Sequence, residues 1–570
     1  MNDVRKTCIT GKLPPPVGTS EWETFSRDSF CVDKTQMIKE LVDLKTRVAL
    51  FTRPRRFGKT TALKMIRAFF EKRLDEKGEK VDTSYLFADK NIWAAGEEYR
   101  KLQGQFPVIY LTFKDLKADS WERAANKLAW DIGSEVVRHR ESINGIWDEG
   151  EKRERLRRVM SCKASVEEVA ESLGLLAEAI HAHWKVKPVI LIDEYDQPIS
   201  SASTFGYYDQ MCAFMRVFLS GALKDNAHVE MGLMTGVLRV AKEGILSGLN
   251  NLKVYTVFDA AFSDAFGFTE DEVRGMAEYY GVPEKMDEIR AWYDGYDFAG
   301  MEIYNPWSVL SYFSSDCRPG PYWLDTSSND LITEIVRELP HNIEKTLRAL
   351  LNDDPAENAP VVPMASELGP YADVMKRKDT LFALLVSAGY LKVASLLENG
   401  YCRVRIPNRE LEQVFVRDIQ NKINEGMEIG ADEIAEALIS RDPAALKTAI
   451  GRFLVESVSY FDSAAEGFYH GLTLGFLAIL RNRYRVTSNG ESGEGRFDLM
   501  LRPYLPGFPG FVIEVKAAYS DADDLKTLAV AALRQIDKKD YPAALRAEGI
   551  AEVVKLGLAY CGKRVELAVG

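Results

Sequence analysis

The chain lacks several features that mark specialised classes of protein. It has no Cys-x-x-Cys pair among its 7 cysteines, which are scattered along 570 residues, so neither a disulfide framework nor a cysteine-based zinc site is expected. Among its 6 histidines, His181 and His183 lie close together beside Trp184, but no third ligand is near. A helix end therefore explains this pair better than a metal site.

Long apolar runs and net positive charge are also absent. The longest apolar stretch, residues 467–480, is too short to span a bilayer and carries His470, so we expect a buried helix and no membrane partner. The N-terminus is polar from Asn2 to Lys6, which argues against a signal peptide and for a cytoplasmic protein. The net charge of −12 restricts any nucleic-acid contact to a local surface.

The length and composition predict a multidomain globular protein. Hydrophobic residues make up 46% and charged residues 28%, as in ordinary globular chains. Because 570 residues exceed what one core accommodates, we expect three domains. Their expected ranges are 1–267, 268–447 and 448–570.

A Gly-Lys-Thr loop between an apolar strand and a helix is the most informative segment. Residues 48–51 are apolar, Gly58, Lys59 and Thr60 follow, and an amphipathic helix runs from Ala62. Amides at a helix N-terminus hold phosphate oxygens, a lysine adds charge on the β/γ-phosphates, and a threonine hydroxyl binds Mg²⁺. The residues expected around a nucleotide are Arg55, Arg56, Phe57, Gly58, Lys59, Thr60 and Thr61.

One position departs from the usual phosphate-binding pattern. The spacing G-x-x-x-x-G-K-[ST] would place a glycine at 53, where this chain has Arg53. On the loop alone, the alternative is a basic connection between a buried strand and a surface helix. The order of strand, Gly-Lys-Thr and amphipathic helix favours the phosphate site.

A second apolar run ends in two consecutive acids. Residues 189–192 are β-branched or apolar, as in a buried parallel strand, and Asp193 and Glu194 follow. At such a strand end Asp193 can reach the Mg²⁺ shell while Glu194 polarises the attacking water. The alternative is an acidic strand end that only caps a helix, and the pairing with the Gly-Lys-Thr loop argues against it.

The remaining apolar runs predict the fold of the first domain. Strands expected at 47–52, 107–113, 189–193 and 229–236 alternate with helices, which indicates a parallel α/β sheet. Thr235 ends the last of these strands and is expected to sense the γ-phosphate. A Thr-Gly turn explains Thr235 equally well from the sequence alone.

The middle of the chain reads as helical. A capping pattern, Thr269-x-x-Glu272, begins this region. Residues 381–408 predict a helix and a β-hairpin, as in a winged-helix element. Aromatic-rich segments with glycine and proline breaks indicate a packed small domain rather than a binding site.

A second set of charged residues lies near the C-terminus. Strands expected at 495–502 and 511–516 form a hairpin that brings Asp498 beside Glu514 and Lys516. The period of two places Glu514 and Lys516 on one face. Two carboxylates and the carbonyl of Val515 would bind Mg²⁺, and Lys516 would orient or help to deprotonate the hydrolytic water.

Other residues near this hairpin fit the same chemistry. Glu466 begins the helix that continues to Leu480 and can supply another carboxylate, while Gln535 can approach the metal from a later helix. Surface salt bridges are the alternative, but the ordered set favours a nuclease. Basic residues that suit a phosphodiester, or else form a solvated face, are Arg481, Arg483, Arg485, Arg534, Lys538 and Lys539.

These segments resemble two known families that together cover nearly the whole chain. Residues 30–35, 51–60, 192–198, 235–239, 248–251 and 304–308 resemble motifs of the bacterial AAA-ATPase-like family, and Arg53 at the glycine position is a trait of that family. Residues 469–471, 491–493, 495–498 and 513–516 resemble its usual C-terminal partner, a PD-(D/E)XK nuclease-superfamily domain.

The resemblance implies an ATP-binding P-loop core, a helical and winged-helix-like middle, and a metal-dependent nuclease fold that acts on DNA or RNA. Arg239 would sense the γ-phosphate of its own subunit or of a neighbour's, which leaves room for a homo-oligomer. We therefore expect an ATPase with Mg²⁺ whose nucleotide state controls a nuclease. The alternative is an ATP-driven switch whose C-terminal domain binds nucleic acid or protein without cutting.

Overall fold

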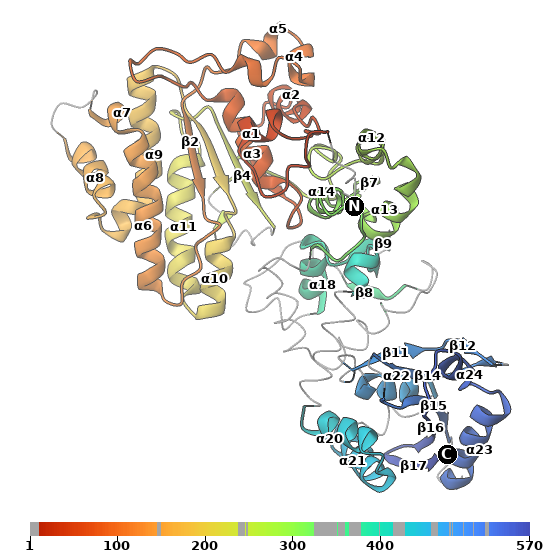
Figure 1. Ribbon diagram of the computed structural model, residues 1–570. Coiled ribbons are helices and arrows are strands. Elements are labelled where there is room, and N and C mark those ends of the chain that lie inside the picture. The colour runs from red at the N-terminus through yellow and green to blue at the C-terminus, as the bar shows by residue number, and fades with distance from the viewer. Residues whose placement is uncertain are drawn as a thin grey trace. The chain divides into compact units, whose positions relative to one another are not determined.

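The protein folds into two compact units, Met1–Phe415 and Val416–Gly570 (Figure 1). The computed structural model describes residues 11–144, 150–237, 245–246, 249–323, 350, 359–363, 378–397, 400–413, 428–457, 466–477, 480, 483–493, 495–504, 507–518 and 524–570. The division into three domains stays a prediction, and its second boundary, residue 448, falls inside the helix α21 (Pro443–Ser457).

A five-stranded parallel sheet is the core of the first unit, as the apolar runs predict. Its strand order is β2-β3-β4-β1-β5, and each neighbouring pair is parallel. Because β4 lies between β1 and β3, the loop after β1 and the acids after β3 flank the end of β4. The strands are β1 (Val48–Thr52), β2 (Val108–Thr112), β3 (Val189–Asp193), β4 (Met231–Gly236) and β5 (Leu252–Tyr255).

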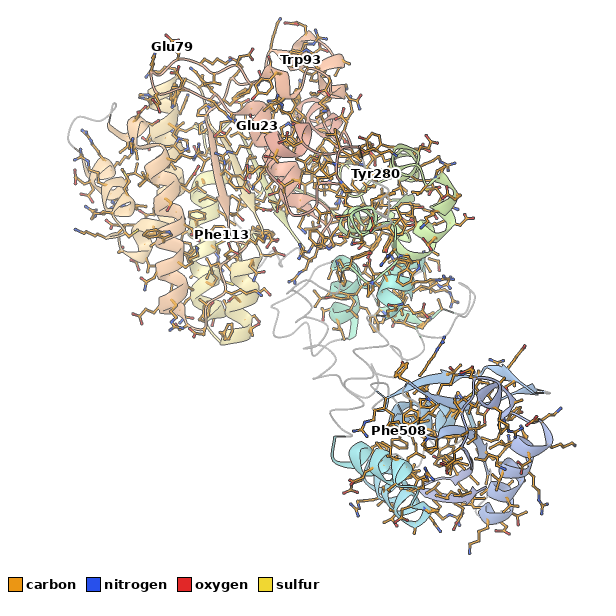
Figure 2. The ribbon with its side chains drawn as sticks, viewed as in Figure 1. Glu23, Glu79, Trp93, Phe113, Tyr280 and Phe508 are labelled. Carbon is orange, nitrogen blue, oxygen red and sulfur yellow. The ribbon has the colours of Figure 1, made fainter. Side chains whose placement is uncertain are left out.

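Helices cover both faces of this sheet (Figure 1). One apolar cluster joins α6, α9 and α11 to the strands, and Phe113, which follows β2, is buried in it against Phe218 (Figure 2). On the other face, α3 contacts β2, β3 and β4. The helices are α1 (Trp22–Arg27), α2 (Gln36–Asp43), α3 (Lys59–Phe70), α4 (Asn91–Ala94), α5 (Glu97–Arg100), α6 (Trp121–Arg138), α7 (Arg140–Asn144), α8 (Glu151–Met160), α9 (Val166–Trp184), α10 (Gln197–Phe205) and α11 (Tyr208–Leu223).

The middle region continues the first unit with a small helical cluster and a three-stranded sheet. The predicted capping box is present, because the hydroxyl of Thr269 accepts the Glu272 amide and the Glu272 carboxylate accepts the Thr269 amide. A helix and an antiparallel hairpin, α18 with β9 and β10, agree with the winged-helix pattern. The elements are α12 (Glu270–Tyr280), α13 (Met286–Tyr293), β6 (Tyr296–Phe298), β7 (Met301–Ile303), α14 (Pro306–Ser314), β8 (Val361–Pro363), α18 (Lys378–Ser387), β9 (Lys392–Leu396) and β10 (Tyr401–Arg405).

A mixed sheet of order β11-β14-β15-β16-β17 builds the second unit, with only β15 and β16 parallel. One face packs on α20, α21 and α22 through a buried apolar cluster, and α23 covers the other. The elements are α20 (Glu428–Ile439), α21 (Pro443–Ser457), α22 (Glu466–Leu477), β11 (Tyr484–Ser488), β12 (Glu491–Ser492), β13 (Gly495–Arg496), β14 (Leu499–Pro503), β15 (Gly510–Ala517), α23 (Leu525–Lys538), α24 (Ala543–Ala547), β16 (Val553–Cys561) and β17 (Arg564–Val569). Of the helices in the described ranges, none is long and apolar enough to cross a membrane.

Candidate nucleotide and metal sites

The Gly-Lys-Thr loop connects the end of β1 to the start of α3. Gly58 precedes the helix with a left-handed backbone, φ 81°, which a side chain adopts only with strain. The first intrahelical bond runs from the Ala62 amide to the Gly58 carbonyl, 2.9 Å. The amides of the first turn therefore have no partner within the helix and can receive an anion.

Lys59 is held inside this loop. Its side chain is buried, with 5% of the residue exposed, and Nζ donates to the carbonyls of Arg53 at 3.1 Å and Pro54 at 2.9 Å. Burial lowers the pKa of Lys59, and the negative charges of Glu194, Asp196 and Asp193 oppose that effect. The ammonium group thus lies where phosphate oxygens at the helix N-terminus would meet it.

The structure brings Thr60, Asp193 and Thr235 into direct contact, although they come from α3, β3 and β4. One carboxylate oxygen of Asp193 accepts the Thr60 hydroxyl at 2.6 Å, and the other accepts the Thr235 hydroxyl, also at 2.6 Å. Asp193 and Thr235 are fully buried. A carboxylate and a hydroxyl beside the phosphate loop are the oxygen donors that suit Mg²⁺.

Glu194 lies beside this group with its backbone in the left-handed region, φ 52°. Such a conformation is unfavourable for a residue with a side chain and is found where neighbouring structure enforces it. Glu194 lines the pocket next to the loop, and burial raises its pKa while the charge of Lys59 lowers it. The geometry presents a carboxylate to whatever occupies the phosphate loop.

The pocket has a volume of about 690 Å³ and extends beyond the motif residues. All seven loop residues expected around a nucleotide, 55–61, line it. Its apolar lining includes Trp22, Phe268, Trp307 and Leu310. Arg239 lies outside the described residues.

The N-terminal segment forms one wall of this pocket through residues between Pro16 and Lys34, and no sequence motif predicts it. The prolines at 14–16 and Gly18 predict loop for residues 1 to about 30, yet Trp22 on α1 is buried and stacks on Phe87 at 5.6 Å between ring centroids. The Leu13 amide donates to the Tyr279 hydroxyl, and the Tyr280 hydroxyl donates to the Leu13 carbonyl. These contacts fasten the segment to α12.

Two loop side chains reach the middle region. Arg56, with φ 70°, places its guanidinium 4.5 Å from the ring centroid of Trp307 on α14. Phe57 is buried against Tyr296 and Phe298 at 4.8 and 5.4 Å between ring centroids. Their contribution to nucleotide binding is therefore expected to include holding the loop against the middle region.

In the second unit, Glu514 is a buried carboxylate on β15. Only 2% of the residue is exposed, and one oxygen accepts both the Lys516 ammonium at 2.9 Å and the Gln535 amide from α23. Its other oxygen has no hydrogen-bond partner within the described residues. Burial raises the pKa of Glu514 to about 7, and nearby Asp498 contributes in the same direction.

Asp498 lies beside Glu514, as the hairpin predicts. One of its oxygens accepts the Val515 amide at 2.8 Å. Val515 was expected to offer its carbonyl to a metal, and the structure shows its amide bound to the neighbouring acid. An incompletely partnered, buried carboxylate next to a second carboxylate fits a divalent cation. No cluster of three or more acids, cysteines or histidines able to hold a metal occurs in the described ranges.

His470 is a residue of this site that the sequence did not single out as functional. Its Nε2 lies 3.2 Å from the Asp498 carbonyl and 3.3 Å from the Ser488 hydroxyl. It follows Glu466 by one helical turn on α22, and the position of the Glu466 side chain lies outside what the structure describes. The signals available were its place in residues 469–471, which resemble the nuclease superfamily, and the turn of α22 that it shares with Glu466.

The alternation of Arg481, Arg483 and Arg485 in the sequence predicts three side chains on one face of a strand, and this prediction is wrong for Arg483. β11 begins at Tyr484, so of this set it contains Arg485 only, while Arg483 precedes it in a turn and Arg481 lies outside the described residues. Arg534 and Lys538 do share α23, and Lys539 is its C-cap.

Comparisons with known proteins match one family model in each unit. Residues 16–246 match a family described as predicted AAA-ATPase, and residues 464–569 match the PD-(D/E)XK nuclease superfamily. An uncharacterized protein from the vnfD 5′ region of Azotobacter chroococcum mcd 1 is 26% identical over 555 residues, 94% of either chain. A Walker-type ATPase of Pyrococcus abyssi is similar at 14% identity, with a TM-score of 0.34, over 69% of this chain and 97% of its own.

Proposed function

We propose that the first unit binds and hydrolyses ATP with Mg²⁺, and that its nucleotide state controls a Mg²⁺-dependent nuclease in the second unit that cuts DNA or RNA. One observation supports this proposal above the others. Three side chains of the chemistry that phosphoryl transfer needs, Lys59, Thr60 and Glu194, line one pocket, and the buried Asp193 accepts the Thr60 hydroxyl beside it, although these residues come from two distant segments.

Each of these residues has a distinct role in the proposal. The amides of the first turn of α3 and the Lys59 ammonium bind the phosphates, for which Lys59 exchanges its bonds to the loop carbonyls. Thr60 and Asp193 hold Mg²⁺, and Thr235 fixes the Asp193 carboxylate. Glu194 orients the attacking water and accepts its proton.

The apolar part of the pocket lining supports a nucleoside as the rest of the ligand. Trp22, Phe268 and Trp307 line it, and a planar base buries apolar area well against aromatic side chains. The same side chains belong to the N-terminal segment and the middle region. A ligand in the pocket would thus contact the N-terminal segment and the middle region.

In the second unit Asp498 and Glu514 would hold Mg²⁺, and Gln535 would keep Glu514 in place. Lys516, already bound to Glu514, would orient the water that attacks the phosphodiester. When Mg²⁺ is bound at either site it neutralises phosphate charge and makes phosphorus more open to attack. The scattered spacing of the cysteines, with no Cys-x-x-Cys pair, supports a reducing compartment such as the cytoplasm.

The test is an assay of the full chain with Mg²⁺, DNA or RNA, and either no nucleotide, ATP or a non-hydrolysable analogue. We expect ATP binding, ATP turnover, and cleavage that depends on which nucleotide is present. Lys59→Ala should lose most ATP affinity, whereas Lys127→Ala, on α6 and away from the pocket, should retain it. Nucleic-acid binding without cleavage under every nucleotide condition would replace the nuclease by a switch that binds without cutting.

A further inference from the structure

Arg53 occupies the position of the missing glycine, and its side chain points into the protein interior. It is fully buried. The guanidinium donates to the carbonyls of Thr52 and Tyr255, both at 2.9 Å, and to the carbonyl of Phe262 at 3.0 Å. These carbonyls belong to the end of β1, the end of β5 and the segment that follows β5.

This cation is held by backbone dipoles and aromatic rings rather than by an ion pair. Its guanidinium carbon lies 5.1 Å from the ring centroid of Phe266 and 5.3 Å from that of Phe298. Within the described ranges no carboxylate pairs with it, and the nearest acids, Asp259 and Glu40, act only at longer range. Burial lowers the pKa of Arg53 to about 10, so it stays charged at neutral pH.

The same residue connects three parts of the proposed nucleotide site. Its carbonyl accepts the Lys59 ammonium, and its amide donates to Gly236, the residue after Thr235, at 3.1 Å. Its guanidinium binds Phe262, whose backbone has a left-handed φ of 59° and whose amide is bound by Glu40. Residues 265, 267 and 268, a few positions on, line the pocket.

The backbone conformation at position 53 does not require a glycine. Arg53 is not among the residues with positive φ, whereas Arg56 and Gly58 are, at 70° and 81°. The freedom that glycine supplies is therefore used later in this loop. A glycine at 53 would instead leave three buried carbonyls without their donor and a space between two aromatic rings.

We propose that Arg53 is a positioning residue for nucleotide binding, which fixes the phosphate loop, the end of β4 and the pocket wall in one arrangement. This inference rests on the proposed ATP binding. It has a counterintuitive consequence: Arg53→Gly, which restores the G-x-x-x-x-G-K-T pattern, weakens ATP binding.

The experiment measures ATP–Mg²⁺ affinity by titration calorimetry, and unfolding temperature separately, on full-length variants. We expect Arg53→Gly and Arg53→Met to lose at least about tenfold in affinity. Methionine keeps the apolar stem between the rings but has no donors, so it isolates the hydrogen bonds. Arg53→Lys retains a charged donor and should lose less.

Arg138→Met is the matched control for a merely structural role. Arg138 also binds a strand carbonyl, that of Val108, and the buried acids Glu71 and Glu135, but it does not line the nucleotide pocket. The Arg138→Met substitution should lower the unfolding temperature and leave ATP affinity within about twofold of wild type. Measurements are made well below the lowest unfolding temperature, so that all variants are folded.

The outcomes distinguish the proposed role of Arg53 from the proposed binding of ATP. Wild-type or tighter ATP binding by Arg53→Gly or Arg53→Met overturns the role of Arg53. So does an equal loss of affinity in Arg138→Met at a matched unfolding temperature. If Arg53→Gly does not fold, Arg53→Met and Arg53→Lys decide. A wild-type protein that binds no ATP would instead refute the proposed function, and this inference with it.

Discussion

Asp193 and Glu514 are both buried carboxylates on parallel strands, but only one of them is fully partnered. Each oxygen of Asp193 accepts a threonine hydroxyl. Glu514 has two donors on one oxygen and none, within the described residues, on the other. Both oxygens of the acid in the first unit have a donor, whereas one oxygen of the acid in the second unit is open to a ligand.

The two lysines differ in the same sense. Lys59 binds backbone carbonyls, which do not titrate, while Lys516 binds a carboxylate whose pKa is raised to about 7. We therefore expect the metal site to be sensitive to pH near neutrality through Glu514. In the proposed function, Lys59 exchanges its carbonyl partners for phosphate oxygens, whereas Glu514 binds Mg²⁺ with its ionised carboxylate.

The largest expected effect is the loss of cleavage when either acid of the second unit is removed. Glu514→Ala or Asp498→Ala should abolish Mg²⁺-dependent cleavage, because a single acid holds Mg²⁺ weakly against its hydration shell. A gel assay of labelled DNA and RNA measures this. Glu433→Ala, on α20 and paired with Arg452 of α21, is the control, and cleavage that persists in Glu514→Ala would remove this site from the mechanism.

Lys516→Ala should separate cutting from binding. The lysine is proposed to act on the water, so cleavage should fall by about a hundredfold or more while nucleic-acid affinity changes little. Binding is followed by fluorescence anisotropy beside the gel assay. Lys555→Ala, on the neighbouring strand and paired with Asp537, should cut normally. A parallel loss of binding and cutting in Lys516→Ala would assign the lysine to the substrate instead.

In the first unit, Glu194→Gln should slow ATP turnover by about a hundredfold while ATP affinity stays within a few-fold. The carboxylate is proposed to act on the attacking water, so its loss raises the barrier more than it weakens the ground state. Single-turnover hydrolysis and titration calorimetry measure the two quantities. Glu178→Gln on α9, paired with Lys152, should match wild type. Unchanged turnover in Glu194→Gln would transfer the role to another residue.

The smallest expected effect is on stability against pH. The folded pKa of Glu514, about 7, exceeds its ordinary value of 4.5, so the fold favours the protonated acid. Its stabilising contribution is complete below about pH 4.5 and is lost as pH rises through 7. The metal-free second unit should thus unfold at a lower temperature at pH 8 than at pH 6, and Mg²⁺ should offset the loss at pH 8.

Scanning calorimetry of the full chain with and without Mg²⁺ tests this dependence. Glu514→Gln should remove the part of the pH-dependent change in unfolding temperature that Mg²⁺ offsets. Glu410 in the first unit is a useful contrast, because its pKa is also raised to about 7 by burial but no second acid is placed beside it by the hydrogen bonds described. Mg²⁺ should not offset the loss of stability that Glu410 causes at high pH. An equal effect of Mg²⁺ on the unfolding temperatures of both units would contradict the proposed difference between Glu410 and Glu514.

The sequence predicts the parts of the fold that rest on local patterns. β1, β3 and β4 were predicted because their apolar runs are buried on both faces, and the hairpin of β14 and β15 because two runs flank a proline-rich and glycine-rich loop. β5 was not predicted, since its 4 residues are only partly buried and show no strong run.

The positions and contacts of side chains were predicted less well than the strands. The motif spacing led to Lys59, Thr60 and Asp193, which the structure brings together. It gave no account of where Arg53 goes, because its partners Tyr255 and Phe262 lie about 200 residues away in the sequence. His470 was missed for the same reason, since its contacts reach Ser488 and Asp498 across a turn and a sheet.

The wall that the N-terminal segment gives to the nucleotide pocket also sets the limits of any useful fragment. A truncated version starting just before β1 would retain the whole Gly-Lys-Thr loop, yet it would lack Trp22 and the bonds from Leu13 to α12. A shortened chain intended for ligand studies should therefore begin ahead of Leu13 and extend through α14. Motif boundaries and the boundary of the smallest working piece do not coincide in this protein.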